Sequence, residues 1–178
     1  SLLVDDMRRQ GREASFVAGH SLGEIVALYS AEVFDMETAL LLLKKRSELM
    51  ASAAGGAMVA VLGFDRNQLA DLVDSEIDVV IANDNSESQV VISGAPNAVN
   101  KVAKELKCKR AVPLQVSGAF HSPFMSQACK SFELELNKIT FKDAIYPVLS
   151  NADPQPCTDT ELLKERLKKQ MIQGVRWR

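Results

Sequence analysis

The chain has 178 residues, 47% hydrophobic and 25% charged, a composition that excludes disordered, collagen-like and coiled-coil proteins. Its 21 basic and 23 acidic residues leave a formal charge of -2, so no overall positive field favours nucleic acid or an anionic membrane as a partner. Three scattered cysteines exclude a disulfide framework or a zinc site, and no apolar run reaches the roughly 20 residues that span a bilayer. We therefore expect a soluble cytoplasmic protein, or one of a plastid or mitochondrial matrix if a transit peptide has been lost.

The first pattern along the chain is an apolar run over residues 14–18, followed by a glycine-rich turn over residues 19–23 and a helix-like segment over residues 24–31. This order predicts a strand, a tight turn and a helix. A second helix is predicted over residues 36–53. Its apolar stripe contains Ala39, Leu40, Leu43 and Met50, and Arg46 falls within it.

Residues 56–116 form a separate unit that begins at a pair of glycines. Its predicted elements are a strand (57–62), a helix (65–73), two strands (77–82 and 89–93), a helix (96–106) and a strand (110–116). This is the split order of ferredoxin-like folds. A polar link over residues 83–88 offers either ligand contacts or only a solvated loop. Two further helices, over 126–138 and 159–170, flank an extended segment over 144–150.

Residues 19–23 read Gly-His-Ser-Leu-Gly and fit the nucleophile elbow, a strained strand-to-helix turn that exposes its serine. The predicted strand and helix around Ser21 are the context that this motif requires. The start of the helix also directs backbone N–H groups toward an oxyanion beside Ser21. A merely structural glycine-rich turn is the alternative, but the agreement of pattern and context favours a nucleophile.

A nucleophilic serine needs a base, which is usually a histidine because its ordinary pKa lies near neutrality. The chain has two histidines. His20 adjoins Ser21, and neighbouring side chains diverge in such a turn, so His121 is the candidate by elimination. Without the elbow, His121 would be interpreted as a surface or structural histidine.

An arginine on an apolar helix stripe has two interpretations. Arg46 either extends its head group into water from the edge of the core, or is buried and binds a carboxylate bidentately. Spacing alone leaves both open. No acidic third member of a triad can be assigned, because Asp143, Asp153 and Asp159 all follow His121 and do not reproduce the Ser, Asp, His order of hydrolases.

Several ordered motifs together resemble the malonyl-CoA:acyl carrier protein transacylases, acyltransferases of fatty-acid synthesis related to the acyltransferase domains of polyketide synthases. The resemblance covers nearly the whole chain. Its motifs are Gly-His-Ser-Leu-Gly-Glu (19–24), Arg46 with Met50, Gly-Ala-Met (56–58), Asn83-x-Asn85 with residues 89–94, Gly-Ala-Phe-His-Ser-Pro-Phe-Met (118–125), residues 147–151, and Gln170 with Val175-x-Trp177.

The resemblance implies an α/β fold with an α/β-hydrolase-like large subdomain, residues 1–55 and 117–178. A ferredoxin-like small subdomain, residues 56–116, is inserted into it. The implied partners are malonyl-CoA and acyl carrier protein. A monomer is expected, with no nucleic acid, membrane, metal or bound redox cofactor.

The resemblance also implies roles. Ser21 attacks the thioester carbonyl of malonyl-CoA, His121 accepts its proton, and the Leu22 N–H holds part of the oxyanion. The malonyl group then passes to the phosphopantetheine thiol of the carrier protein. Arg46 pairs with the malonyl carboxylate, and an arginine left unpaired by acetyl makes that substrate costly.

Further substrate-binding residues follow from the same resemblance. Ala119-Phe120-His121 is similar to the version of this motif that selects malonyl in polyketide domains. Leu22 after the nucleophile is likewise similar to a residue that goes with malonyl selection. Asn83 and Asn85 lie in a family segment near the active site.

The chain departs from the family pattern at both ends. The family begins with a strand and a Gly-Gln-Gly-x-Gln loop that supplies a second oxyanion donor. It ends with a loop where a backbone carbonyl orients the histidine and a glutamine lies nearby. We expect both supports to be absent here, and losing one oxyanion donor costs about 100-fold to 1,000-fold in rate. The segment alone is therefore expected to be weak or inactive, and its parent active.

Two alternatives stay open. A serine esterase or thioesterase would use the same elbow, although it has no need for a carboxylate clamp such as Arg46. An inactive carrier-protein docking module could use the basic residues Lys164, Arg166, Lys168, Lys169, Arg176 and Arg178, which could equally be a solvated helix face. Retention of both Ser21 and His121 argues against docking alone.

Overall fold

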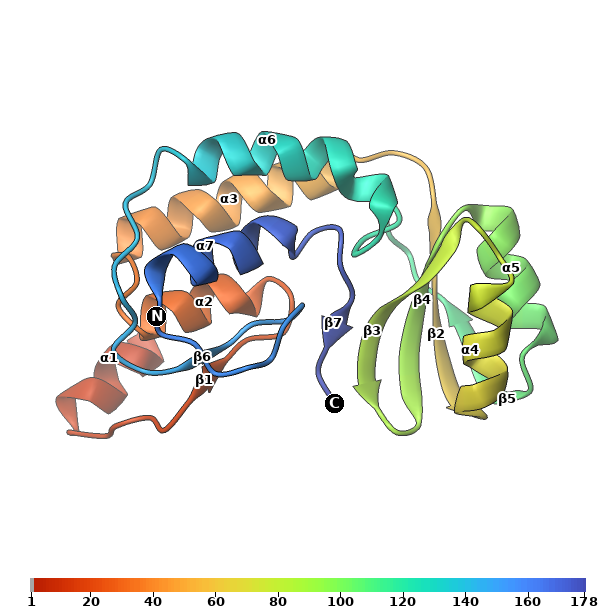
Figure 1. Ribbon diagram of the computed structural model, residues 1–178, viewed down its shortest axis with the longest axis horizontal. Helices are drawn as coiled ribbons and strands as arrows, with labels where there is room; N and C mark the ends of the chain where they lie inside the picture. Colours follow the sequence, from red (N-terminus) through yellow and green to blue (C-terminus); the bar gives the residue numbers. More distant parts are fainter. Residues whose placement is uncertain (1) are drawn as a thin grey trace.

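The computed structural model describes residues 2–178, which form two parts joined side by side (Figure 1). The first part contains α1 (Leu2–Arg9), β1 (Val17–Ala18), α2 (Gly23–Ser30), α3 (Met36–Ser52), a short 3₁₀ turn η1 (Pro123–Met125), α6 (Ser126–Leu136), β6 (Val148–Leu149) and α7 (Thr160–Lys169). The second contains β2 (Ala57–Phe64), α4 (Arg66–Asp74), β3 (Val79–Ser86), β4 (Gln89–Gly94), α5 (Pro96–Glu105) and β5 (Cys108–Pro113). The last strand, β7 (Val175–Arg176), joins the second sheet. The α/β class expected from the sequence is confirmed.

The core of the first part lies between α2, α3, α6 and α7, as the crowded helices in Figure 1 show. The buried stripe of α3 consists of Ala39, Leu42, Arg46 and Met50. The prediction was wrong for Leu40, which is 58% exposed. An unbroken run of apolar residues over 39–43 does not fix the phase of a helix, and packing selected the positions three and four residues apart.

The small sheet of the first part consists of β1 and β6 in parallel, with Val17 opposite Val148 and Ala18 opposite Leu149. The predicted strand over 14–18 and the extended segment over 144–150 are both shortened to two residues. Strand structure is limited to the stretch where the two segments hydrogen-bond to each other. The parallel pair brings residues 19–21 and 150–151 to the same edge, because both strands run in the same direction.

The second part follows the predicted order of strand, helix, strand, strand, helix and strand. Its sheet has the order β5-β2-β4-β3-β7, antiparallel except for the parallel pair of β3 and β7. Helices α4 and α5 cover one face of this sheet (Figure 1). They bury Leu69, Val99 and Val102 against Val61 and Ile92. Alternate residues of the strands therefore form a core separate from that of the first part.

The polar segment over residues 83–88 is not the loop that the sequence predicts. Strand β3 continues to Ser86, and only residues 87–88 form the turn into β4. Asn and Asp are depleted in strands, which is why the prediction failed. Here β3 has two register shifts, between Ile81 and Asn83 and between Asp84 and Ser86, and these irregularities accommodate the polar run.

Strand β7 connects the two parts. It follows α7 of the first part and pairs in parallel with β3 of the second, with Asn83 opposite Val175 and Asp84 opposite Arg176. The sequence analysis predicted no strand there. Two residues are too few to show a period in sequence, so only the packing of the two parts defines this strand.

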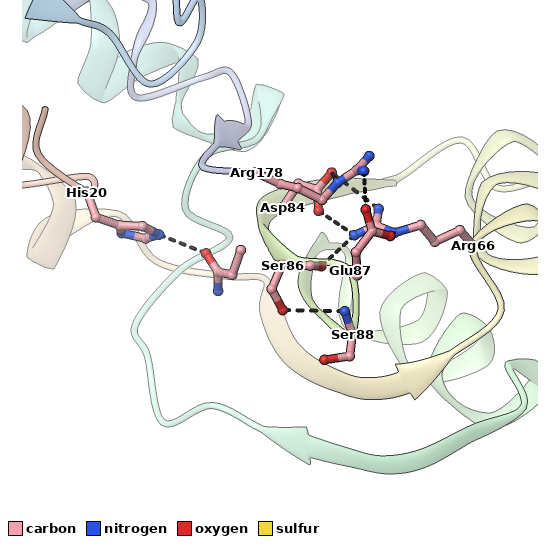
Figure 2. A network of polar contacts seen from close by, with 8 residues as sticks. His20, Arg66, Asp84, Ser86, Glu87, Ser88 and Arg178 are labelled. Carbon is pink, nitrogen blue, oxygen red and sulfur yellow. Dashed lines mark hydrogen bonds and ion pairs between the residues drawn. The ribbon is translucent and has the colours of Figure 1, made fainter.

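Charged side chains reinforce this connection (Figure 2). We call Arg66, Asp84, Glu87 and Arg178 the β3–β7 cluster. Asp84 accepts from Arg66 Nη2 at 2.7 Å and pairs with Arg178 Nε at 3.3 Å, while Arg178 Nη1 donates to Glu87 at 2.6 Å. The cluster thus links α4, β3, the turn after β3 and the residues that follow β7.

Within residues 2–178, the structure contains no helix that combines the length and the apolar character needed to cross a membrane.

Candidate active site

Ser21 occupies a sharp turn between β1 and α2. It has a φ of 51°, a left-handed conformation that is uncommon for a side-chain-bearing residue. A β-carbon on Gly19 would lie 1.9 Å from the Gly23 carbonyl oxygen, so only glycine fits at the start of the turn. Asn151 holds the strained turn. It accepts from the Ser21 N–H at 2.6 Å and donates to the Gly19 carbonyl at 2.7 Å. The elbow geometry predicted from residues 19–23 is present.

His121 lies against Ser21, as the elimination argument predicts. Its Nε2 is 2.8 Å from Ser21 Oγ, and its ring is buried, with 3% of the residue exposed. The other ring nitrogen, Nδ1, is 2.9 Å from the Gln170 carbonyl oxygen. A carbonyl can only accept, so Nδ1 carries the proton and Nε2 is left to accept the Ser21 hydroxyl proton.

The pKa of His121 is lowered to about 4. Burial of the ring is the largest cause, and the positive charge of Arg46 adds to it, while the hydrogen bond to the Gln170 carbonyl works in the opposite direction. The ring is therefore neutral at physiological pH. A neutral imidazole bonded to a hydroxyl can act as a general base.

The carbonyl that orients His121 belongs to Gln170, which corrects the sequence analysis. There, the carbonyl and its nearby glutamine were expected to lie beyond the end of this chain. Gln170 instead caps the C-terminus of α7, where the last helical carbonyls lack partners within the helix and are free to accept. One of the two reasons for expecting a weak or inactive chain is therefore wrong.

Arg46 is buried, with 3% of the residue exposed, so the water-facing interpretation is wrong. Its Nη2 donates to Ser21 Oγ at 3.0 Å and its Nε donates to Gln170 Oε1 at 2.9 Å. Burial lowers the pKa of Arg46 to about 10, which still leaves the guanidinium protonated at neutral pH. A fixed positive charge thus lies directly beside the candidate nucleophile.

Glu24 and Asn151 belong to the site, but the sequence analysis gave neither a role. Glu24 is 1% exposed, and its Oε2 accepts from Gln170 Nε2 at 2.9 Å and from the Asn151 N–H at 3.1 Å. Burial raises the pKa of the Glu24 carboxyl, and the hydrogen bonds from Gln170 and Asn151 oppose that shift. One signal was available: a glutamate on the face of α2 that otherwise buries Ile25 and Leu28.

Leu22 and Phe120 are the chain neighbours of Ser21 and His121. The Leu22 side chain is exposed, and its N–H makes no hydrogen bond to any part of the chain that the structure describes. An unused N–H at the start of α2 can bind an oxyanion. Phe120 is half-buried and packs against both the core of the first part and the neighbouring residues of the second sheet.

Asn83 and Asn85 lie on β3, and neither makes a direct hydrogen bond to Ser21 in the region described. Asn83 is buried beside β7. The Asn85 amide oxygen accepts from His20 Nε2 at 2.8 Å, the bond drawn from His20 in Figure 2. The His20 ring also meets the Trp177 ring edge-on at 5.2 Å. His20 therefore points to the second part and away from Ser21, as the divergence argument predicts.

The basic residues near the C-terminal end do not form a free patch. Arg166 is buried and bonded to Asp153 at 2.5 Å, and Lys168 pairs with Glu165 at 2.6 Å. Arg178 belongs to the β3–β7 cluster. This pairing weakens the docking-module alternative, because three of its six basic residues are already paired within the chain.

Residues 2–178 hold no group of three or more His, Cys, Asp or Glu side chains that could bind a metal ion. The arrangement of Ser21, His121 and Arg46 can instead carry nucleophilic chemistry on a substrate with a negative charge.

Fold and site together are those of an acyl-transfer domain, and the match to a family model agrees. The acyl transferase domain model matches residues 2–177, and the chain belongs to that family.

Among its relatives, the malonyl CoA-acyl carrier protein transacylase of Synechocystis sp. is 52% identical over 178 residues, which are 100% of this chain and 61% of the relative. The crystal structure of the Synechocystis malonyl-CoA:ACP transacylase superposes with a TM-score of 0.96 over 99% of this chain and 60% of that one. A malonyl-transacylase solved in complex with its type II PKS acyl-carrier protein matches with a TM-score of 0.86 and 32% identity, over 98% of this chain and 60% of that one. The chain thus spans about three fifths of the length of these relatives.

Proposed function

We propose that the protein containing this chain transfers a malonyl group from coenzyme A to the phosphopantetheine thiol of acyl carrier protein. The observation that carries the proposal is the position of Ser21 Oγ, 2.8 Å from a neutral His121 nitrogen and 3.0 Å from the Arg46 guanidinium. A nucleophile and a carboxylate-binding cation at one point suit an acyl group that itself carries a carboxylate. The names of the similar proteins support the same reaction.

In the first half-reaction, Ser21 Oγ attacks the thioester carbonyl while its proton passes to His121 Nε2. The His121 ring becomes positively charged, and the Gln170 carbonyl on Nδ1 stabilises that charge. The unused Leu22 N–H binds the oxyanion that forms on the former carbonyl oxygen. Coenzyme A then leaves with the proton from His121, and malonyl remains as an ester on Ser21.

Arg46 selects the acyl group. When malonyl enters, its free carboxylate binds the Arg46 guanidinium. That guanidinium is positioned by two hydrogen bonds, from its Nε to Gln170 Oε1 and from its Nη2 to Ser21 Oγ. An acetyl group offers no anion to this buried cation. The difference between a paired and an unpaired buried charge therefore separates the two substrates by several kcal/mol.

In the second half-reaction, neutral His121 removes the proton of the carrier thiol, and the thiolate attacks the malonyl ester. Breaking the ester returns the proton to Ser21. The related transacylase solved with its acyl-carrier protein supports a carrier as the acceptor. These steps use the side chains and backbone N–H groups of the chain and call for no redox cofactor.

We extend the proposal to the subdomains. Residues 1–55 and 117–178 would form part of an α/β-hydrolase-like subdomain, and residues 56–116 a ferredoxin-like one. The sheet order β5-β2-β4-β3 supports the second assignment. Asn83, Asn85 and Phe120 lie at the boundary of the two and would contact the substrate there.

Intact-protein mass spectrometry tests the function. Incubation with malonyl-CoA should add about 86 Da to the chain, the mass of one malonyl ester formed by covalent catalysis, and Ser21→Ala should abolish the adduct. Adding carrier protein should move that mass to the carrier, whereas release to water would indicate a thioesterase. The Synechocystis transacylase serves as the positive control. No adduct on this chain, nor on a chimera completed with the remaining segments of that relative, would contradict the proposal.

A further inference from the structure

A buried carboxylate lies directly behind the nucleophile. Glu24 is the second residue of α2, and its own N–H donates to the Ser21 carbonyl at 3.0 Å. Its Oε1 is buried and makes no hydrogen bond of good geometry among residues 2–178, although the nearby Ser150 hydroxyl lowers the pKa of the carboxyl, while Oε2 accepts two hydrogen bonds. Burying a carboxylate costs free energy unless it is fully paired. Glu24 is thus a costly residue in a well-packed core, and its position invites a functional explanation.

Two hydrogen-bonded paths lead from Glu24 to the reacting groups. The first runs through Gln170, whose Nε2 also donates to the Ser21 carbonyl at 2.8 Å. Gln170 further accepts from Arg46 on its side-chain oxygen and from His121 on its backbone carbonyl. The Glu24 carboxylate, together with the Ser21 carbonyl and Arg46, therefore fixes which way the Gln170 amide faces, with its nitrogen toward Glu24 and its oxygen toward Arg46.

The second path runs through Asn151. Glu24 accepts the Asn151 backbone N–H, and the Asn151 side chain holds the strained Ser21 turn from both sides. All three groups proposed to meet the substrate, namely Ser21, His121 and Arg46, are thus one intermediate residue away from Glu24. The Glu24 side chain makes no hydrogen bond to any of these three residues. It therefore acts on them only through Gln170 and Asn151 and through its charge.

The electrostatics fit the same role. Arg46 on α3 acts on Glu24 through its positive charge, which favours ionised Glu24. Burial nevertheless raises the pKa of Glu24. In a folded protein a raised carboxyl pKa means that ionisation works against stability, which is greatest below the ordinary pKa and falls as pH rises. Stability therefore does not explain why a carboxylate occupies this position.

We infer that Glu24 is a positioning residue for acyl transfer: through Gln170 and Asn151 it holds the nucleophile, the base and the carboxylate-binding arginine in one arrangement. The inference deepens the proposed function and rests on it for the chemistry. It predicts that loss of Glu24 disturbs serine reactivity and acyl-group selection together, because both depend on the orientation of Gln170.

Two substitutions separate the hydrogen bonds from the charge. Glu24→Gln keeps the shape and one acceptor oxygen but removes the charge, whereas Glu24→Ala removes both. Glu48→Gln, on the exposed face of α3, is the matched control for changing an acid to an amide. Labelling of Ser21 by a fluorophosphonate is expected to slow by about 100-fold in Glu24→Ala, as a misplaced catalytic group does, and by about tenfold in Glu24→Gln.

Stability distinguishes positioning from a structural role. Urea unfolding at neutral pH should show that Glu24→Gln stays folded without denaturant, although the substitution leaves the buried Arg46 without its negative neighbour and lowers the unfolding midpoint. Its reactivity should nevertheless fall, and in acylation its preference for malonyl-CoA over acetyl-CoA should fall in parallel. If reactivity fell only in proportion to the folded fraction, or stayed within twofold in both variants, the inference would be overturned.

Nuclear magnetic resonance of the His121 ring separates this inference from the proposed function. Glu24→Ala should shift the Nδ1–H resonance bonded to Gln170, and Glu48→Gln should leave it unchanged. A shifted resonance in a chain that never accepts malonyl would refute the proposed substrate and uphold positioning by Glu24. An unshifted resonance would refute the positioning role even if malonyl transfer were demonstrated.

Discussion

The chain contains two clusters of charged residues that differ mainly in burial. Behind Ser21, Glu24 and Arg46 are almost completely buried, and each hydrogen bond of the group has a defined donor and acceptor. In the β3–β7 cluster the side chains are 26% to 75% exposed. Both clusters link elements that are distant in sequence, but the one behind Ser21 is shielded from water and the β3–β7 cluster is exposed to it.

The difference shows what each cluster can do. Exposed ion pairs contribute about 0 to 1 kcal/mol and weaken with salt, so the β3–β7 cluster helps to align the two parts at little energetic cost. Buried charges interact strongly, but only when their partners are in place. The cluster behind Ser21 is therefore suited to chemistry, where a small displacement has a large effect on rate.

Removal of the base should have the largest effect. His121→Ala should slow acylation of Ser21 by about 10⁴-fold, since nothing else in the described site can take the proton, while the protein should remain folded. Rapid-quench acylation with malonyl-CoA measures the rate, and circular dichroism checks the fold. A loss of less than tenfold would show that His121 is not the base.

A matched pair of arginine substitutions compares the two clusters directly. Arg46→Met should lower the free energy of unfolding by about 3 kcal/mol at neutral pH, because it leaves the buried Glu24 carboxylate without its positive neighbour. Arg178→Met should have a much smaller effect. Urea unfolding of both variants makes the comparison, and equal losses would mean that burial does not distinguish the clusters.

The pH dependence of stability tests the environment of His121. A pKa lowered from 6.5 to about 4 means that the fold favours the neutral ring. The resulting stability is fully present above the ordinary pKa and is lost as pH falls through that window. The contribution of His121, measured as the difference in unfolding free energy between the chain and His121→Gln, should therefore shrink from about pH 7 to about pH 4. A difference independent of pH would contradict the lowered pKa.

Salt should produce the smallest effect and confine it to the exposed cluster. Raising the salt concentration to about 1 M should erase the difference in unfolding midpoint between the chain and Arg178→Met, because exposed pairs are screened. The difference for Arg46→Met should persist. If salt erased both differences, the buried pair would be more hydrated than its exposed fraction indicates.

The sequence predicted the proximity of Ser21 and His121 better than the residues that support them. Ser21 followed from a local motif and His121 by elimination, and both predictions agree with the 2.8 Å contact. The burial of Arg46 could not be decided from helical spacing, because a stripe of apolar residues does not reveal whether its edge faces water. The helix packing of the first part settled it.

The supports of the site depend on contacts between distant segments. Gln170 reaches Ser21 across 149 residues and Asn151 across 130, and no local pattern encodes such pairs. The same holds for β7, which is a strand only because β3 lies beside it. By contrast, the short, largely apolar runs over residues 57–62 and 89–93 correctly predicted the order of elements in the second part.

The central claim is that a buried arginine beside the nucleophile selects an acyl group with a carboxylate. Competition between malonyl-CoA and acetyl-CoA for Ser21 tests it most directly, with adducts of about 86 and about 42 Da resolved by intact-protein mass. The chain should take malonyl almost exclusively, and Arg46→Gln should lower the malonyl to acetyl ratio by about 100-fold. An unchanged ratio in Arg46→Gln would contradict the claim.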